Sequence, residues 1–238
     1  EIEKRALKVS SFNVNTGSLK SFPPIELSGE SREDRRRIHK LADAVHKALF
    51  DQEGIASSRI LFACQSDTPK ADGSGWISEI WECDWDGANA HPITKEESYC
   101  VTPVLFPKDQ FLYVSYKIGQ PKIYLGSLRS KTGKKLINLR GNQLLPAISM
   151  QRDKLAFICD AGGRTDLFIQ SFDPKTAEVG TPIQLFSYPH STQASPTFSP
   201  DGSKLAFVSN KDGGMRVYIL SAIPSKKRNT PELLSKKK

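Results

Sequence analysis

The stretch Ser195-Pro-Thr-Phe-Ser-Pro-Asp-Gly-Ser-Lys-Leu-Ala-Phe-Val-Ser209 is the most informative part of this chain. It predicts a β-hairpin with a first strand over 196–199 and a second strand over 205–209. The Pro-Asp-Gly tripeptide at 200–202 predicts the turn, because proline pre-sets φ and glycine accepts a left-handed backbone. The second strand is apolar at successive positions, so we expect both of its faces to be buried.

The same pattern recurs along the chain with a constant spacing. In three places a proline stands nine residues before the leucine of an apolar strand, as in the pairs Pro103 and Leu112, Pro146 and Leu155, and Pro196 and Leu205. A fourth apolar strand begins at Ile60 without a hairpin partner before it. Each apolar strand is followed by a strand with an aromatic residue, a polar turn and a short apolar segment, so the repeating unit contains four strands.

The repeating units predict a β-propeller. They begin near residues 60, 112, 155 and 205, with spacings of 52, 43 and 50 residues. Four-stranded units of about 40–50 residues are typical of propeller blades. We therefore predict a mainly β chain with propeller repeats over 56–238, preceded by part of a small α/β domain over 1–55. A β-sandwich of unrelated hairpins is the alternative, but it does not explain the constant spacing.

One helix and two strands are predicted for the first domain. Residues 6–14 and 18–22 predict two strands, and residues 31–50 predict a helix in which Ser31 and Asp34 resemble a capping box. Two strands alone are marginally stable, so we expect an N-terminal part of this domain to be absent. The charged face of the helix is expected to face solvent, and it carries Arg32, Arg35, Arg36, Lys40, Asp43 and Lys47.

Two polar segments of the first unit are predicted to lack regular structure. Residues 65–78 are rich in Asp, Gly, Ser and Lys and predict a surface loop. The segment Asp84-Trp-Asp-Gly87 resembles the start of a calcium loop but lacks the remaining ligands, so it predicts a hairpin turn.

The chain carries no recognisable catalytic or metal-binding motif. His39 and His46 could share a helix face, but no third ligand accompanies them. The cysteines at 64, 83, 100 and 159 have no metal-binding spacing. Motifs of serine hydrolases, zinc peptidases and phosphate-binding loops are also missing from the sequence. We therefore predict no catalytic residues, no metal and no cofactor.

The charge of the chain does not predict nucleic-acid binding. The formal net charge is +8, but the basic residues gather on the predicted helix and over 226–238. The aromatic residues fall inside strand patterns, where they are expected in the core rather than on a stacking surface. No apolar run is long enough to span a membrane.

The repeat at 195–209 resembles the WD40-like repeat of the TolB family and of some peptidase propellers. The helix at 38–49 and its continuation over 54–65 are similar to the junction between the N-terminal domain and first blade of the TolB family. This resemblance covers the chain from about Arg35 onward, and the junction is its more specific part.

The resemblance implies a periplasmic, non-enzymatic component of the Tol–Pal system of Gram-negative bacteria. Such a protein has a small α/β domain and a six-bladed propeller. It binds the lipoprotein Pal through the propeller, which makes it peripheral to the outer membrane, and TolA through an N-terminal segment. It supports outer-membrane integrity and cell division. TolA binding is not expected of this chain by itself, because the chain lacks that segment.

The four units are not expected to close a ring by themselves. The first unit begins at its second strand, and in closed propellers the missing inner strand is usually supplied by the C-terminus. We therefore expect the natural protein to continue for about two more units of about 45 residues.

The polar connections between successive units are the predicted partner-binding surface. Each connection runs from the outermost strand of one unit to the innermost strand of the next, across one face of the propeller. Ordinary solvated loops are the alternative. The predicted contact residues are Lys95, Glu97, Arg140, Asn142, Gln143, His190 and Gln193.

Two further functions remain open from the sequence. The chain could be the propeller of a prolyl-oligopeptidase-like serine peptidase, in which case a hydrolase domain would follow it. It could also be a sugar- or lactone-processing propeller, which normally needs a central metal, although the inner strands carry no visible set of ligands.

Overall fold

The computed structural model describes residues 5–70, 73, 75–106, 109–225 and 229–234. Parts of the basic C-terminal segment, 226–228 and 235–238, therefore lie outside the described residues. The chain forms two compact units, one of residues 1–60 with 82–91 and one of residues 61–81 with 92–238. It is mainly β, as predicted. None of the described helices is long and apolar enough to cross a membrane.

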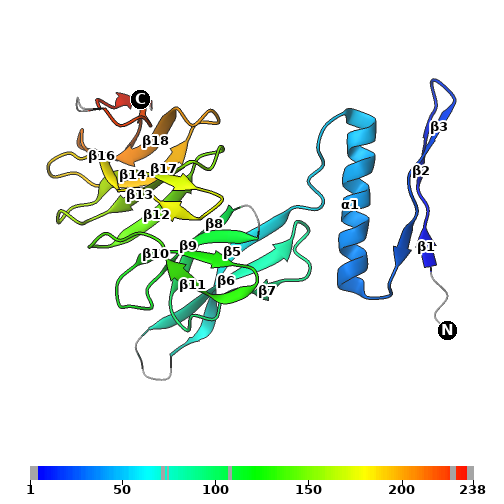
Figure 1. The fold of residues 1–238 in the computed structure, drawn as a ribbon, viewed down its shortest axis with the longest axis horizontal. Coiled ribbons are helices and arrows are strands. Elements are labelled where there is room, and N and C mark those ends of the chain that lie inside the picture. The colour runs from blue at the N-terminus through cyan, green and yellow to red at the C-terminus, as the bar shows by residue number, and fades with distance from the viewer. Residues whose placement is uncertain (1–4, 71–72, 74, 107–108, 226–228, 235–238) are drawn as a thin grey trace. The chain divides into compact units, whose positions relative to one another are not determined.

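The first unit contains one helix and two short antiparallel strand pairs (Figure 1). Helix α1 has the predicted bounds, Ser31–Phe50. The predicted hairpin is also present, and its Gly17 N–H donates to Asn13 O at 2.9 Å. The strands pair as β1 (Arg5–Leu7) with β4 (Ile25–Leu27) and β2 (Ser10–Asn13) with β3 (Ser18–Ser21).

The capping box predicted for this helix is wrong. Ser31 is already helical, and Glu30 occupies the N-cap position without a side-chain cap bond. The Asp34 carboxylate instead accepts hydrogen bonds from the backbone N–H groups of Ser28 (2.7 Å) and Gly29 (2.9 Å). The hydrogen bond from Ser28 is the main cause that lowers the pKa of Asp34. This side chain therefore holds the segment that leads into the helix.

The charged face of α1 is only partly solvated, which corrects the prediction for two arginines. Arg35 forms an ion pair with Asp86 at 2.7 Å. Arg36 lies 3.4 Å from Glu82 and 3.5 Å from Asp84, whose carboxylates are almost completely buried. These acidic residues belong to the 82–91 segment of the first unit. Their sequence distance from the helix explains why local patterns could not reveal the pairs.

Four antiparallel sheets follow one another along the chain (Figure 1). The first sheet has three strands and begins with the second strand of a blade, as predicted. The first sheet contains β5 (Arg59–Pro69), β6 (Trp76–Asp84) and β7 (His91–Pro92), and the second contains β8 (Cys100–Phe106), β9 (Gln110–Ser115), β10 (Lys122–Ser127) and β11 (Ser130–Lys135). The third sheet contains β12 (Gln143–Ile148), β13 (Lys154–Cys159), β14 (Asp166–Asp173), β15 (Glu178–Val179) and β16 (Ile183–Phe186). The fourth sheet contains β17 (Gln193–Phe198), β18 (Lys204–Ser209), β19 (Arg216–Ser221) and β20 (Glu232–Leu233).

The repeated X-Pro pair forms a β-bulge in each innermost strand. The register shifts at this point in β8, β12 and β17. The residue before each proline is left-handed, with φ of 50° at Thr102, 51° at Leu145 and 49° at Ser195. A bulge lets a proline, which has no N–H, stand in a strand without breaking a ladder hydrogen bond. The constant spacing between proline and leucine therefore records a bulge that is repeated in three blades.

The loop predicted over 65–78 is mostly strand. β5 continues to Pro69 and β6 begins at Trp76, so the two strands extend into a long hairpin. The polar composition reflects exposure of this hairpin rather than absence of regular structure. The predicted turn at 84–87 is confirmed, because Gly87 N–H donates to Asp84 O at 2.9 Å.

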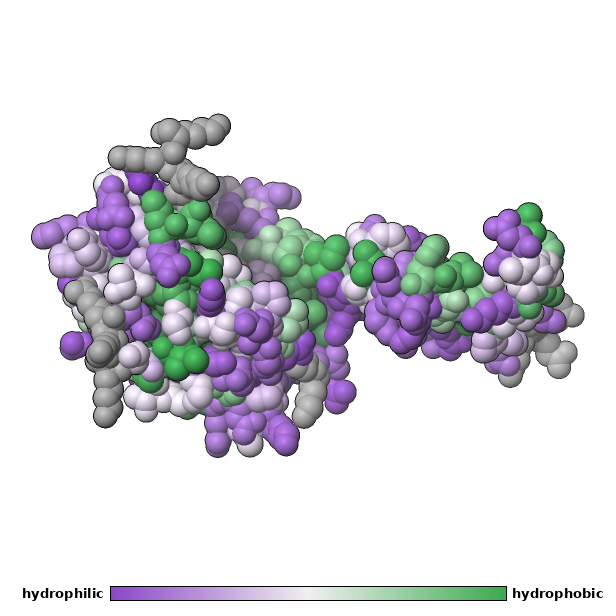
Figure 2. All heavy atoms as spheres, turned by 90° about the horizontal axis from the view of Figure 1, so that it is seen from above, coloured by the Kyte–Doolittle hydropathy of each residue, from purple (hydrophilic) through white to green (hydrophobic). Residues whose placement is uncertain are grey.

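Apolar clusters lie between successive sheets and hold them together. The cluster between the third and fourth sheets brings Ile158 and Leu167 together with Phe207 and Tyr218, all nearly inaccessible to solvent. Burial of each such side chain contributes about 2–3 kcal/mol. Similar clusters join the first sheet to the second and the second to the third. Figure 2 shows polar and charged side chains over much of the outer surface, with apolar patches between them.

The fourth sheet corrects the prediction that its second strand is buried on both faces. Ala156 and Ile158 of the third sheet are buried because the fourth sheet covers them. The equivalent Ala206 and Val208 are only half-buried, since their face of the fourth sheet has no described sheet against it.

Candidate partner-binding face

The connections between blades lie beside the loops that join the second and third strands of each blade. Backbone N–H groups bridge the two kinds of segment, as Tyr116 donates to Tyr99 O at 3.1 Å and Thr192 donates to Asn210 Oδ1 at 2.7 Å. We call the surface formed by these segments the connection face. It comprises residues 95–99, 116–121, 139–142, 160–165, 187–192 and 210–215 of the second unit.

Carboxylates hold the backbone of the first connection. Glu79 of β6 accepts hydrogen bonds from the N–H groups of Glu96 and Glu97, each at 2.8 Å, and another from the Thr94 hydroxyl. Residue 97 has a left-handed φ of 51°, which is uncommon for a residue other than glycine. The two backbone bonds to Glu79 stabilise this conformation.

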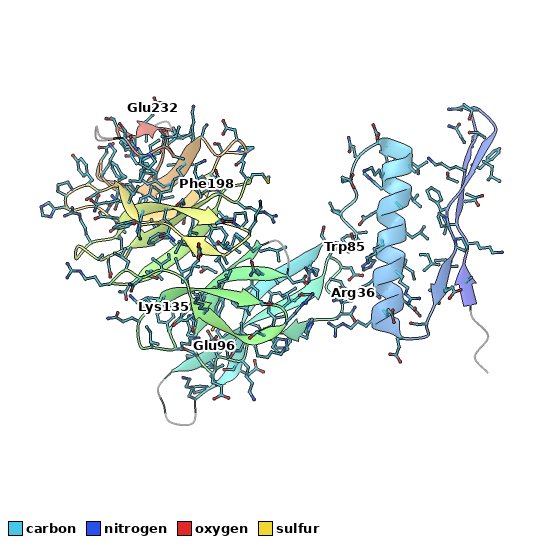
Figure 3. The ribbon with its side chains drawn as sticks, viewed as in Figure 1. Arg36, Trp85, Glu96, Lys135, Phe198 and Glu232 are labelled. Carbon is cyan, nitrogen blue, oxygen red and sulfur yellow. The ribbon has the colours of Figure 1, made fainter. Side chains whose placement is uncertain are left out.

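Glu96 is the centre of a buried hydrogen-bond network beside strand β11 (Figure 3). Its carboxylate is 1% exposed and accepts from Tyr113 Oη at 2.6 Å and from Gly133 N at 2.9 Å. The Lys117 ammonium lies 2.7 Å away and also stands over the Tyr124 ring. Burial by itself raises the pKa of Glu96, but the hydrogen bonds from Lys117, Tyr113 and Gly133 outweigh it, so the pKa is lowered. Glu96 therefore remains an anion that joins the first connection to the second sheet.

The second connection has a comparable anchor. Asp160, directly after β13, accepts from Asn142 N at 2.5 Å and from Asn142 Nδ2 at 2.8 Å. Beneath it, the nearly buried Lys122 donates its ammonium hydrogens to the carbonyl groups of Leu139 (3.2 Å) and Gly141. Carbonyl oxygens therefore solvate a cation under this part of the surface.

The third connection is held by neutral and charged groups. Besides the bond from Thr192 to Asn210, the Arg164 guanidinium donates to Ser187 Oγ at 2.6 Å. Lys211 lies over the rings of Tyr218 (4.7 Å) and Tyr188 (5.8 Å). All three connections are therefore held by side chains of neighbouring strands and loops.

The seven predicted contact residues differ in their exposure to solvent. The side chains of Lys95, Glu97, Arg140 and His190 are exposed, whereas Asn142 is half-buried and bonded to Asp160. Gln143 and Gln193 are 0% and 1% exposed, so no partner can reach them in this conformation.

The two buried glutamines are structural, which corrects their predicted role. Gln143 donates to Leu139 O at 2.7 Å and accepts from Ile123 N at 3.3 Å. Gln193 donates to Ser191 Oγ at 2.9 Å.

Sequence reasoning missed the residues that anchor the connections. Asp160 and Asn210 each follow the second strand of a blade directly, so aligning the repeats would have found them. Glu79 and Lys122 give no such signal, because their partners lie on segments well separated in sequence.

The described residues contain no cluster of metal-ligating side chains, and their cysteines form no disulfide. No group of three or more His, Cys, Asp and Glu side chains in the described part could hold a metal ion. All four cysteines are free, and burial raises the pKa of Cys100 to about 12, which keeps this thiol protonated and unreactive.

Comparison with known proteins agrees with this architecture. Residues 46–231 match the family model described as the TolB beta propeller domain. The chain is 49% identical over 230 residues to the TolB homologue of Protochlamydia amoebophila. The aligned region covers 94% of this chain and 48% of that protein. The chain spans about half the length of the curated relatives it matches.

Solved structures show the same fold at low sequence identity. The crystal structure of TolB from Acinetobacter baumannii superposes with a TM-score of 0.72 and 20% identity, covering 96% of this chain and 53% of that one. A Mycobacterium tuberculosis puromycin-hydrolyzing peptidase superposes with a TM-score of 0.54 and 15% identity, covering 74% of this chain and 29% of that one. The fold alone therefore does not distinguish a binding propeller from the propeller of a peptidase.

Proposed function

The chain belongs to the TolB β-propeller family, and from this membership we propose that it is part of a non-enzymatic interaction protein of the Tol–Pal system. The protein acts in the periplasm and binds the lipoprotein Pal through its propeller. By this contact it supports outer-membrane integrity and cell division. TolA binding through an N-terminal segment belongs to the same proposal and concerns the whole protein.

The observation that supports the proposal best is the form of the connection face. Its backbone is held by Glu79, Asp160 and Asn210. Its side chains Arg140 and His190 remain exposed, and none of the described residues bonds to either of them. A backbone that is already held by internal hydrogen bonds loses little conformational entropy on binding, and side chains without partners in the chain are available to a partner.

The test is to replace three exposed residues of this face and measure the affinity for Pal. We expect the combined change Lys95→Ala, Arg140→Ala and His190→Ala to weaken binding by about 10-fold or more, because contact side chains near an interface centre carry most of the affinity. The matched control changes Arg129→Ala and Lys175→Ala, in the turns that follow β10 and β14 at the other end of their blades, where binding should change by less than about 2-fold. Unchanged affinity of the triple variant would overturn the proposed face.

The peptidase alternative has less support. The similarity to a peptidase propeller is at 15% identity and reflects the fold only, whereas the curated relatives at much higher identity are TolB homologues. Peptide hydrolysis by the purified protein, lost on inhibition of a serine nucleophile, would favour the peptidase.

A further inference from the structure

We propose that the connection face presents unpaired basic side chains to its partner and selects an acidic protein surface. This inference rests on the proposed function, since it names the chemistry of the partner that docks on the same face. The formal charges of the six segments, together with those of the neighbouring Glu79, Lys122 and Asp166, nearly balance. Their positions differ, however, because most acidic groups point inward and several basic groups point outward.

The acidic groups of this face are occupied by internal hydrogen bonds. Glu79 caps two backbone N–H groups, and Glu96 is buried under Tyr113 and Lys117. Asp160 holds the second connection through both of its oxygens. The oxygens of these carboxylates are engaged by donors of the protein itself, so they are less available than free carboxylates to pair with cations of a partner.

Two further acids are neutralised by neighbouring groups. Asp166 is 1% exposed and accepts from Arg164 at 3.2 Å and from Gln184 at 2.7 Å. Asp212 is exposed but accepts from Lys211 and from Tyr218 Oη, each at 2.8 Å. Among the described residues of the three connections, Glu97 is the acid whose side chain is exposed without such a bond.

The basic groups occupy the outer positions. Lys95 and Arg140 are exposed, and no carboxylate of the described residues pairs with either side chain. Beneath Arg140, the ammonium of Lys122 is solvated by carbonyl oxygens rather than paired with a carboxylate. The exposed Lys95 and Arg140 side chains are therefore available to pair with carboxylates of a partner.

Exposed apolar groups on the same loops complete the surface. Ile118 is 57% exposed, Met215 is 61% exposed and Tyr188 is 40% exposed. Apolar and aromatic side chains surrounded by cations fit a partner with carboxylates around an apolar centre. The partner surface is therefore expected to carry Asp and Glu near Arg140 and Lys95.

The experiment measures the association rate of the whole protein with Pal at different salt concentrations. If acidic groups on Pal are attracted to this face, raising the salt from about 0.03 M to about 0.3 M should slow association by about 10-fold. Arg140→Glu should slow association by a similar factor at low salt and flatten the salt dependence. The matched control is Arg129→Glu, the same charge change at the far end of β10, where the rate should change by less than about 2-fold.

The outcomes distinguish the inference from the proposed function. If the alanine variants weaken Pal binding but association is independent of salt and unaffected by Arg140→Glu, docking on this face stands and the electrostatic inference is wrong. If Pal does not bind, a poly-glutamate peptide is the probe, with hydrogen exchange as the readout. Protection of residues 139–142 by poly-glutamate but not by poly-lysine would support the inference without Pal. Protection by neither peptide would overturn it.

Discussion

Removal of the Glu96 carboxylate is the sharpest test of how the connection face is held. In Glu96→Ala, the buried Tyr113 hydroxyl and the Gly133 N–H lose their acceptor, and Lys117 loses its ion pair. A hydrogen bond from a buried donor to a charged acceptor contributes about 1.5–3 kcal/mol. Lys117 is 26% exposed and can turn to water, so its ion pair adds only about 0.5–1 kcal/mol.

We therefore expect Glu96→Ala to lower the free energy of unfolding by about 3–5 kcal/mol, within the range known for broken buried pairs. Glu96→Gln keeps an acceptor for Tyr113 and should cost about 1–2 kcal/mol. The control is Glu97→Ala, the adjacent exposed carboxylate, with an expected change within about 0.5 kcal/mol. Urea unfolding followed by tryptophan fluorescence measures all three.

A double-mutant cycle with Tyr113→Phe isolates the contact itself. Because Tyr113 Oη donates to Glu96, the tyrosine change should cost less in the Glu96→Ala background, with a coupling energy of about 1–2 kcal/mol. If Glu96→Ala costs less than about 1 kcal/mol, or if the two changes are additive, the network does not stabilise the connection and this explanation is wrong.

The Glu96 carboxylate also makes the free energy of unfolding depend on pH, and the direction of this dependence follows from its pKa. The pKa of Glu96 is lower in the folded protein than the ordinary value of 4.5. Its stabilisation is therefore fully present above pH 4.5 and is lost as the pH falls through the lower folded pKa. Acidification should reduce the free energy of unfolding of the native protein more than that of Glu96→Gln. Equal losses in the two proteins would contradict the assigned pKa direction.

Two further changes test packing and charge. A Cβ at Gly126 would lie 2.5 Å from Phe111 Cζ, so Gly126→Ala should cost about 1–3 kcal/mol in urea unfolding, whereas Gly214→Ala, with open space around it, should stay within about 0.5 kcal/mol. Arg36→Ala leaves two nearly buried carboxylates without this partner and should lower the free energy of unfolding by about 1–3 kcal/mol. The control is Arg37→Ala, whose carboxylate partner is exposed and whose loss should lower it by about 0.5 kcal/mol. Equal costs within either pair would contradict these assignments.

Local sequence patterns were sufficient for the repeating units and the helix. The spacing of Pro196 and Leu205, repeated twice more, predicted the blades because it records a bulge and a hairpin that are both local structures. The helix over 31–50 followed from an apolar stripe with the period of a helix. Neither inference required knowledge of which segments meet in three dimensions.

The anchors of the connection face could not be predicted in this way. Glu79 binds backbone groups 17 and 18 residues away, and Glu96 binds Gly133, 37 residues away. A carboxylate in a polar stretch has the same sequence appearance whether it faces solvent or caps a buried N–H group. For the same reason, the sequence could not distinguish the exposed members of the predicted contact set, such as Arg140, from the buried ones, such as Gln143.

The repeat constrains the backbone of the connection face more strongly than its chemistry. Asp160 and Asn210 occupy equivalent positions and both accept a hydrogen bond from the preceding connection, although one is charged and the other is neutral. The bulge is likewise formed by Thr102, Leu145 and Ser195, three residues with little in common. A geometry that tolerates such differences leaves the outward side chains free to vary from blade to blade. Partner selection therefore depends on the charges that this chain places on the common backbone, and the salt dependence of binding is the property that reports them.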